Sequence, residues 1–300
     1  MRIGVTVPNV HETLAERTTI EAVARTAEDL GFDSIWCNDH VVIPRAPDGA
    51  EAEPAYAAAY GQQRGQNVYD PLITLAYLAA ATNRILLGTS VYLLPLRHPV
   101  VAAKQVVSLD ALSGGRFVFG VGVGWLEGEF EAVGVPFRER GRRADEAIAV
   151  FKALCAGDSV AFLPEPVQQP HPPLWIGGRS DAAMRRAARS GDAWHPSHLT
   201  TEELRRRIPE LRAECEGAGR APDDVAVATR RKALRSASAA EAERDRVLYG
   251  DAGAIAETVA ELEQVGISHL IVELPGSSEA ELLESLDWFG REVLSEIPRG

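Results

Sequence analysis

Two adjacent side chains, Asp39 and His40, have the residue types needed to exchange protons with a substrate. They follow "SIWCN" (34–38), an apolar run of strand length. A histidine beside a carboxylate can titrate near neutral pH and act as a general acid or base. Taken alone, an Asp-His dipeptide is more often a hydrogen-bonded pair in a loop, so its neighbours in the fold must decide between the two.

A row of glycines forms a second unusual pattern. In "FGVGVGW", Gly120, Gly122 and Gly124 alternate and lead to Trp125. This is not the dinucleotide fingerprint G-x-G-x-x-G. On a strand, alternation places all three glycines on one face, where bulky side chains normally pack. Either large neighbouring side chains or a flat ligand with its phosphate must therefore approach this face.

A third glycine pair is followed by a helical pattern. Gly177, Gly178, Arg179 and Ser180 lie between the apolar run "PLWIGG" and a helix that starts near Asp181. Unpaired N–H groups at a helix start, with glycines that permit close approach, can bind a phosphate. A tight strand-to-helix turn would also need these glycines, and this motif alone does not separate the two explanations.

The elements that must position these residues alternate along the chain. Apolar runs of strand length are followed by amphipathic helical patterns, several of which end at glycine. The predicted strands are 2–8, 34–38, 85–94, 116–124, 173–178, 192–197, 225–230 and 269–274. The predicted helices are 18–30, 70–82, 99–112, 138–154, 180–190, 201–218, 252–265 and 278–294.

Alternation of this kind predicts parallel strands joined by helices. Eight such units indicate an α/β fold, a (β/α)8 TIM barrel formed by residues 1–300 as one domain, with chemistry at the carboxyl ends of the strands. A doubly wound open sheet is the alternative. Two long connections are inserted, 41–69 after strand 2 and 155–172 before strand 5. We expect a substrate lid in the first and a stabilising brace on the opposite face in the second.

Several segments closely resemble the luciferase-like monooxygenase superfamily, and within it the branch that uses the deazaflavin coenzyme F420. The resemblance lies in "SIWCNDHVV" (34–42), 85–125, 134–154 and "PHPPLWIGGRSDAAMRRAARSGDAW" (170–194), and beyond residue 200 only the general pattern agrees. The resemblance implies a (β/α)8 barrel, the fold of this superfamily, in agreement with the eight predicted units. Its members are often homodimers.

The resemblance also implies roles for particular residues. "GTSV" (88–91) matches a bulge, often with a cis peptide, that supports the cofactor ring, which implicates Thr89, Ser90 and Val91, with Ser90-Val91 at the bulge. Asp39 and His40 match a pair that faces the ring and the substrate. The remaining residues implied to bind the cofactor, around its phosphate-bearing tail, are Gly122, Val123, Gly124, Gly177, Gly178 and Arg179. The glycine row would then make room for the cofactor.

One position departs from a related enzyme of the superfamily. In the F420-dependent sugar-phosphate dehydrogenase, a catalytic glutamate directly follows the equivalent glycine segment, whereas this chain has Trp125. Glu127 and Glu129 are close in sequence, but no feature of the sequence indicates that either can substitute. Trp125 is therefore a candidate wall of an apolar substrate pocket, with a core tryptophan as the alternative.

The resemblance implies an F420-dependent oxidoreductase that transfers a hydride between the deazaflavin and a small organic substrate. An FMN-dependent two-component monooxygenase, which would need a flavin reductase, is the first alternative. A non-catalytic flavin- or deazaflavin-binding protein is the second. The Asp39-His40 pair favours an enzyme, because a carrier needs no proton-transfer pair.

Composition limits the other function classes. Hydrophobic residues make up 46% of the chain and charged residues 25%, and the formal net charge is −12. Such a charge argues against nucleic acid and anionic membranes as partners. The three cysteines are too far apart for a zinc site, and the seven histidines show no metal spacing, so we predict no metal. Neither a signal peptide nor a membrane-length apolar run is recognisable, and we expect a cytoplasmic protein.

Overall fold

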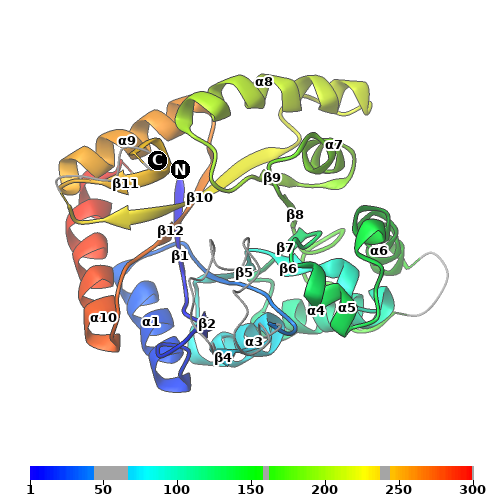
Figure 1. Cartoon of the computed structure of the whole chain (residues 1–300), viewed down its shortest axis with the longest axis horizontal. Helices are drawn as coiled ribbons and strands as arrows, with labels where there is room; N and C mark the ends of the chain where they lie inside the picture. Colours follow the sequence, from blue (N-terminus) through cyan, green and yellow to red (C-terminus); the bar gives the residue numbers. More distant parts are fainter. Residues whose placement is uncertain (44–66, 158–161, 237–243, 299–300) are drawn as a thin grey trace, which may run out of the picture.

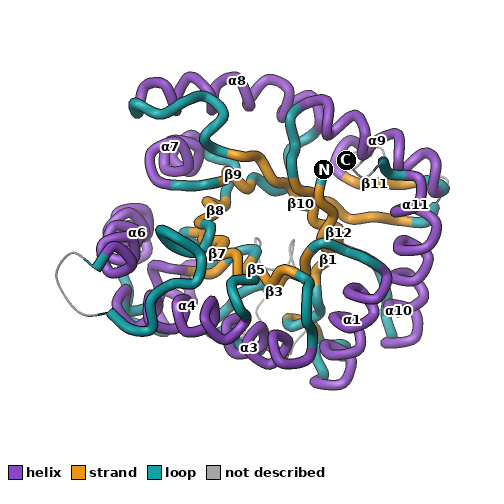
Figure 2. Tube along the Cα trace, turned by 180° about the vertical axis from the view of Figure 1, so that it is seen from behind, coloured by secondary structure: helices purple, strands orange, loops and turns teal. Residues whose placement is uncertain are grey.

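Eight parallel strands close into a barrel in the computed structural model, which describes residues 1–43, 67–157, 162–236 and 244–298. In Figures 1 and 2 they form the central ring. The strands are β1 (Arg2–Thr6), β3 (Ser34–Cys37), β5 (Leu86–Thr89), β7 (Phe117–Gly122), β8 (Leu174–Gly177), β9 (Ala193–His195), β10 (Ala226–Leu234) and β12 (His269–Glu273). The strand order runs from β10 through β12 and β1 to β9, and because β9 pairs in turn with β10, the ring is complete. The TIM barrel is confirmed, and the open sheet is wrong.

Helices surround the barrel (Figures 1 and 2). They are α1 (Arg17–Leu30), α3 (Pro71–Ala81), α4 (Pro99–Ser113), α6 (Arg140–Ala156), α7 (Asp181–Ser190), α8 (Thr201–Gly217), α9 (Ala252–Val265) and α10 (Glu279–Trp288). Local signals set their ends. Asp70 accepts hydrogen bonds from the N–H groups of Leu72 and Ile73 at the start of α3, and α1 ends at Gly31, whose φ of 83° suits glycine.

Several short elements were not predicted. They are β2 (Val10–His11), which pairs with β4 (Asn67–Val68), and also β11 (Val247–Tyr249) and α5 (Glu127–Ala132), while β6 (Tyr92–Leu93) lies within the predicted strand 85–94. The predicted strand 85–94 is interrupted between β5 and β6, where the Ser90–Val91 peptide is cis. The predicted helix 278–294 divides into α10, the π-helical η4 (Phe289–Val293) and α11 (Leu294–Glu296).

Two tryptophans fill the barrel interior. Trp36 on β3 packs with Val118 and Ile271, and the Trp175 ring lies 4.7 Å from it. Glycine on the neighbouring strand makes this possible, because a Cβ at Gly88 would lie 2.3 Å from the Trp36 ring. The larger core lies outside, between the strands and the helices. Since the interior is packed, ligands can reach the barrel only at its ends.

The two long connections differ in what the structure describes. Residues 44–66, most of the expected lid, lie outside the described residues. In the second connection, the carboxylate of Asp110 on α4 accepts hydrogen bonds from the backbone N–H groups of Val167 and Gln168, at 2.7 and 3.1 Å. These contacts are those expected of a brace.

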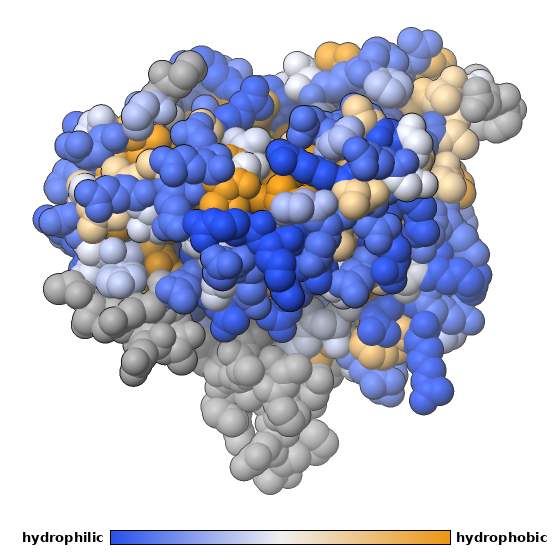
Figure 3. Space-filling view, turned by 90° about the horizontal axis from the view of Figure 1, so that it is seen from above, coloured by the Kyte–Doolittle hydropathy of each residue, from blue (hydrophilic) through white to orange (hydrophobic). Residues whose placement is uncertain are grey.

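The surface agrees with the charged composition. Figure 3 looks onto the molecule from the top of Figure 1 and shows mostly hydrophilic residues with smaller apolar groups between them. Within the described ranges, no helix combines the length and the apolar character needed to cross a membrane.

Candidate active site

Polar side chains from four strands meet at the carboxyl end of the barrel. Arg230 on β10 donates to the side-chain oxygen of Asn38, which follows β3, at 2.5 Å. Its other terminal nitrogen lies 3.1 Å from the carboxylate of Glu273 on β12. The carbonyl of Ser90, which follows β5, is 3.5 Å from the same guanidinium. Chain segments more than 200 residues apart in sequence are thereby joined at this end of the barrel.

His40 has a carboxylate partner, and that partner is Glu129. The Nδ1 of His40 lies 2.9 Å from Oε2 of Glu129, and the two side chains are only 3% and 1% exposed. The second oxygen of Glu129 accepts a hydrogen bond from the backbone N–H of Val41 at 2.7 Å. An ionised carboxylate only accepts, so with Glu129 ionised it is Nδ1 of His40 that donates this hydrogen bond. This buried pair has the composition of a general acid–base device.

Asp39 belongs to a separate network. Its carboxylate accepts two hydrogen bonds from Arg97, one of 2.8 Å from Nη2, and a third of 2.7 Å from the backbone N–H of Leu93. The Arg97 guanidinium also lies 4.2 Å from the centre of the Tyr92 ring. Burial raises the pKa of Asp39, and the hydrogen bonds from Arg97 oppose this shift. Asp39 therefore anchors the segment after β5 and is not the carboxylate partner of His40.

Trp125 stands beside His40 at the mouth. Its ring meets the His40 ring edge-on with 6.2 Å between the centroids, and the residue is 37% exposed. The alternative of a core tryptophan is therefore wrong. An exposed aromatic ring next to a buried imidazole suits one wall of a substrate pocket, the role for which the sequence makes Trp125 a candidate.

The segment around the cis peptide is fixed by its neighbours. Thr89 donates from its hydroxyl to the carbonyl of Gly120 at 2.7 Å, and the Ser90 hydroxyl lies 2.9 Å from Nε2 of His195 on β9. Burial and the nearby charge of Arg230 lower the pKa of His195 to about 4, so this histidine is neutral at pH 7. Ser90 is thus held by a neutral imidazole below the mouth.

The glycine row is explained by packing. A Cβ at Gly120 would lie 1.9 Å from the carbonyl oxygen of Thr89, and one at Gly122 would lie 2.3 Å from Cγ2 of Val91. A Cβ at Gly177 would lie 2.6 Å from the other methyl group of Val91. The expectation that the row makes room for a cofactor is therefore wrong at Gly120 and Gly122, where the segment after β5 occupies the space. Val123 and Gly124 follow this row and are half-buried.

The turn between β8 and α7 carries unused hydrogen-bond donors. Gly178 has a φ of 115°, and the Ser180 hydroxyl accepts from the N–H of Ala183 at 3.2 Å. The backbone N–H groups of residues 179–182 donate to no acceptor within the described part of the chain. Arg179 is exposed beside them. Free N–H groups at a helix start can bind a phosphate group.

Comparison with known proteins identifies the family. The luciferase-like monooxygenase profile matches residues 1–256. The chain belongs to this family. An uncharacterized protein of Mycobacterium tuberculosis is 33% identical over 223 residues, which are 70% of this chain and 75% of that protein. The FMNH2-dependent dimethylsulfone monooxygenase of Pseudomonas putida is 30% identical over 181 residues, 55% of this chain and 49% of that protein.

A solved structure of similar fold is an F420-dependent secondary alcohol dehydrogenase in complex with an F420-acetone adduct. It matches with a TM-score of 0.81 and 17% identity over 99% of both chains. The family profile confirms the resemblance to the luciferase-like monooxygenases. Of the two characterised proteins, the alcohol dehydrogenase depends on F420 and the dimethylsulfone monooxygenase on FMNH2.

The sequence pointed to Asp39, His40, Ser90 and Trp125 at the mouth, but not to Arg97 or His195 and not to Glu129. Its only local signal is a glutamate in a short helix that directly follows the glycine row, and Glu127 has the same signal while being exposed. Among the residues that the structure describes, no three His, Cys, Asp or Glu side chains are grouped to hold a metal ion.

Proposed function

We propose that this protein is an F420-dependent oxidoreductase that transfers a hydride between the deazaflavin and a small organic substrate. The observation that carries the proposal is the buried pair of His40 and Glu129 at the carboxyl end of β3. Hydride transfer to or from a C–O or C–N bond requires a proton to move at the substrate. A buried imidazole with a fixed carboxylate partner supplies that proton transfer.

The residues at the mouth fit a cofactor that has a flat ring and a phosphate. The N–H groups of residues 179–182, which lack a described acceptor, together with Gly177 and Gly178, would hold the phosphate. Ser90 and Val91, fixed by His195 and by the glycines of β7 and β8, would support the ring. When bound, F420 supplies two-electron hydride chemistry.

The chain's own residues would manage the proton and the solvent. Glu129 holds the proton of His40 on Nδ1, which fixes the ring orientation and makes Nε2 the basic nitrogen. Nε2 would take the proton from an alcohol, or return it to a carbonyl, at the substrate. The indole of Trp125 would cover an apolar substrate and exclude water. Asp39, bound to Arg97, would position His40 through the backbone.

An FMN-dependent two-component monooxygenase, supplied by a flavin reductase, is the second candidate. It is favoured by the 30% identity to the FMNH2-dependent dimethylsulfone monooxygenase. A non-catalytic carrier has less support, because it has no use for a buried proton-transfer pair.

The two cofactors can be separated by direct titration. When each cofactor is titrated by its own fluorescence, we expect F420 to bind at least about tenfold more tightly than FMN. We expect His40→Ala to keep most of the F420 affinity and to lose at least about tenfold in turnover. Equal or tighter FMN binding would favour the monooxygenase instead. Unchanged turnover in His40→Ala would remove this residue from the mechanism.

We also propose that the protein forms a homodimer. α3 is apolar around its whole circumference, and such helices are normally buried. Nevertheless Ile73 on α3 is 70% exposed, and Val101 and Leu112 on α4 are 54% and 76% exposed. These two helices are neighbours, so a second copy is the expected cover for their outer faces. Analytical ultracentrifugation of the parent and of Ile73→Glu would test this.

A further inference from the structure

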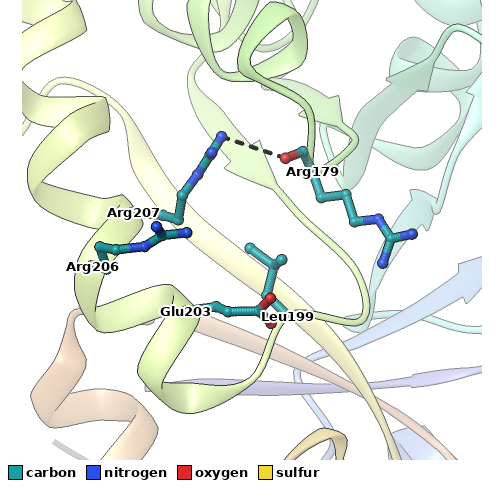
Figure 4. A pocket seen from close by; sticks show the side chains of 5 residues that line it. All are labelled: Arg179, Leu199, Glu203, Arg206 and Arg207. Atoms are coloured by element: carbon teal, nitrogen blue, oxygen red, sulfur yellow. Dashed lines mark hydrogen bonds between the residues drawn. The ribbon is translucent and has the colours of Figure 1, made fainter.

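A cavity of about 270 Å³ lies between the β8–α7 turn and the first turns of α8. Its lining consists of Arg179, Leu199, Glu203, Arg206 and Arg207 (Figure 4). Three of these five residues are arginines in a protein whose formal net charge is −12. Arg206 and Arg207 belong to the charged segment 203–214 of α8, whose sequence alone is typical of a solvated helix face. In the tertiary structure, part of this helix face borders the cavity, and the β8–α7 turn adds a third arginine, Arg179.

One arginine is fixed in place as part of the wall. Arg207 donates to the carboxylate of Asp181 at 2.7 Å and to the backbone carbonyl of Arg179 at 3.4 Å, the contact drawn in Figure 4. Its side chain is 14% exposed. Its buried Nε donates no hydrogen bond, although the carboxylate of Glu210 lies 3.4 Å away. Arg207 is therefore held rigidly in the cavity wall, with its charge paired to Asp181 and Glu210.

The one carboxylate in the lining is already used. Glu203 accepts a hydrogen bond from the backbone N–H of Thr200 at 2.7 Å in the capping box of α8. Within the described ranges, no carboxylate lies within 4.0 Å of the guanidinium of Arg179 or of Arg206. The cavity thus keeps two exposed cations whose charge is not neutralised by a close partner.

The charge of Arg179 also acts beyond the cavity. His198, in the connection from β9 to α8, has its pKa lowered first by burial and then by the charges of Arg230, Arg179 and Lys232, against which Glu273 acts. Arg179 is therefore within electrostatic range of the connection that leads into α8.

We propose that this cavity binds an anionic group, a carboxylate or phosphate, at the end of the cofactor remote from its reacting ring. The inference rests on the proposed function in one respect, namely that the anion belongs to the cofactor. Guanidinium groups bind carboxylates and phosphates through paired hydrogen bonds. Arg206 and Arg179 supply the exposed donors, and Arg207, paired with Asp181 and Glu210, forms the fixed wall behind them. The binding position is separate from the N–H groups at the start of α7.

Charge reversal at one position outside the mouth tests the proposal. Arg206→Glu should weaken F420 binding at least about tenfold, since a charge-assisted contact is replaced by repulsion. Arg212→Glu, six residues further along α8 and paired with Asp223, is the matched control and should change the affinity less than about twofold. Raising the salt concentration should weaken F420 binding by the parent more than by Arg206→Glu. Equal affinity of Arg206→Glu and the control would overturn the inference while leaving F420 dependence intact.

A second measurement keeps the inference testable if F420 is the wrong cofactor. Citrate and inorganic diphosphate, each added to the ligand-free protein, should raise its thermal midpoint, and Arg206→Glu should lose this shift while Arg212→Glu keeps it. A shift with citrate alone assigns the cavity to carboxylates, and a shift with diphosphate alone assigns it to phosphates. No shift with either anion, in a parent that also fails to bind F420, would overturn both proposals.

Discussion

Replacing Glu129 by glutamine tests the proton-transfer pair with the least change in shape. The carboxylate of Glu129 makes two contacts, 2.9 Å to Nδ1 of His40 and 2.7 Å to the N–H of Val41. The amide oxygen can keep the second contact. Its NH2 group then faces Nδ1 and drives the histidine proton to Nε2, the opposite tautomer.

The size of the effect follows from the charge that is lost. A hydrogen bond to a charged group contributes about 1.5–3 kcal/mol and a neutral one about 0.5–1.5 kcal/mol, so the exchange costs roughly 1–1.5 kcal/mol. Each 1.36 kcal/mol is about tenfold in rate, and the wrong tautomer adds to this. We expect Glu129→Gln to lower turnover by about 10- to 100-fold, with little change in F420 affinity.

Three controls make this prediction specific. Glu127→Gln alters an exposed glutamate on the same short helix and should leave the rate within about twofold. In a double-mutant cycle, Glu129→Gln should have almost no further effect once His40 is alanine, because the two residues act as a unit. Turnover is followed by F420 absorbance with a substrate that the parent accepts, and 15N shifts of the His40 ring report the tautomer without a substrate. Parent-like turnover of Glu129→Gln with the proton still on Nδ1 would refute the reasoning.

Two further predictions concern stability. Gly122→Ala should lower the free energy of unfolding by about 1–3 kcal/mol, because the added Cβ would lie 2.3 Å from a methyl group of Val91. Gly217→Ala is the control, and because the space around Gly217 is open, this substitution should be neutral or stabilising. Equal denaturation midpoints of the two variants would contradict the packing explanation. Burial lowers the pKa of His195 to about 4 and that of His269 to about 3, so unfolding takes up protons below the ordinary value of 6.5. The contribution of these two histidines to the free energy of unfolding should therefore be constant above pH 6.5. Below pH 6.5 it should fall by about 1.4 kcal/mol per pH unit for each histidine. In urea titrations at pH 7 and pH 5, His269→Gln should remove about half of this fall.

Much of the fold is determined by signals that act over a few residues. The alternation of apolar runs with amphipathic helices predicts the eight barrel strands. The glycine after the first helical pattern predicts a helix end, and α1 ends there, at Gly31 in the left-handed conformation. The positions of Asp39 and His40 after a strand place them at the carboxyl end of the barrel once the strands are parallel. These features need only backbone preferences and hydrophobic periodicity, which a sequence displays directly.

The partners of the site residues were decided by the tertiary structure. The sequence places Asp39 beside His40, but the barrel gives Asp39 to Arg97 and brings Glu129 to His40 from 89 residues away. Asp39 and His40 lie beyond the end of β3, so their partners come from the segments that follow β5 and β7 at the same end of the barrel. The glycine row follows the same rule, since its reason lies in Val91 on the neighbouring segment. Local patterns therefore determined where the candidate groups lie, and barrel closure determined which of them meet, because only closure brings distant strand ends within hydrogen-bonding distance.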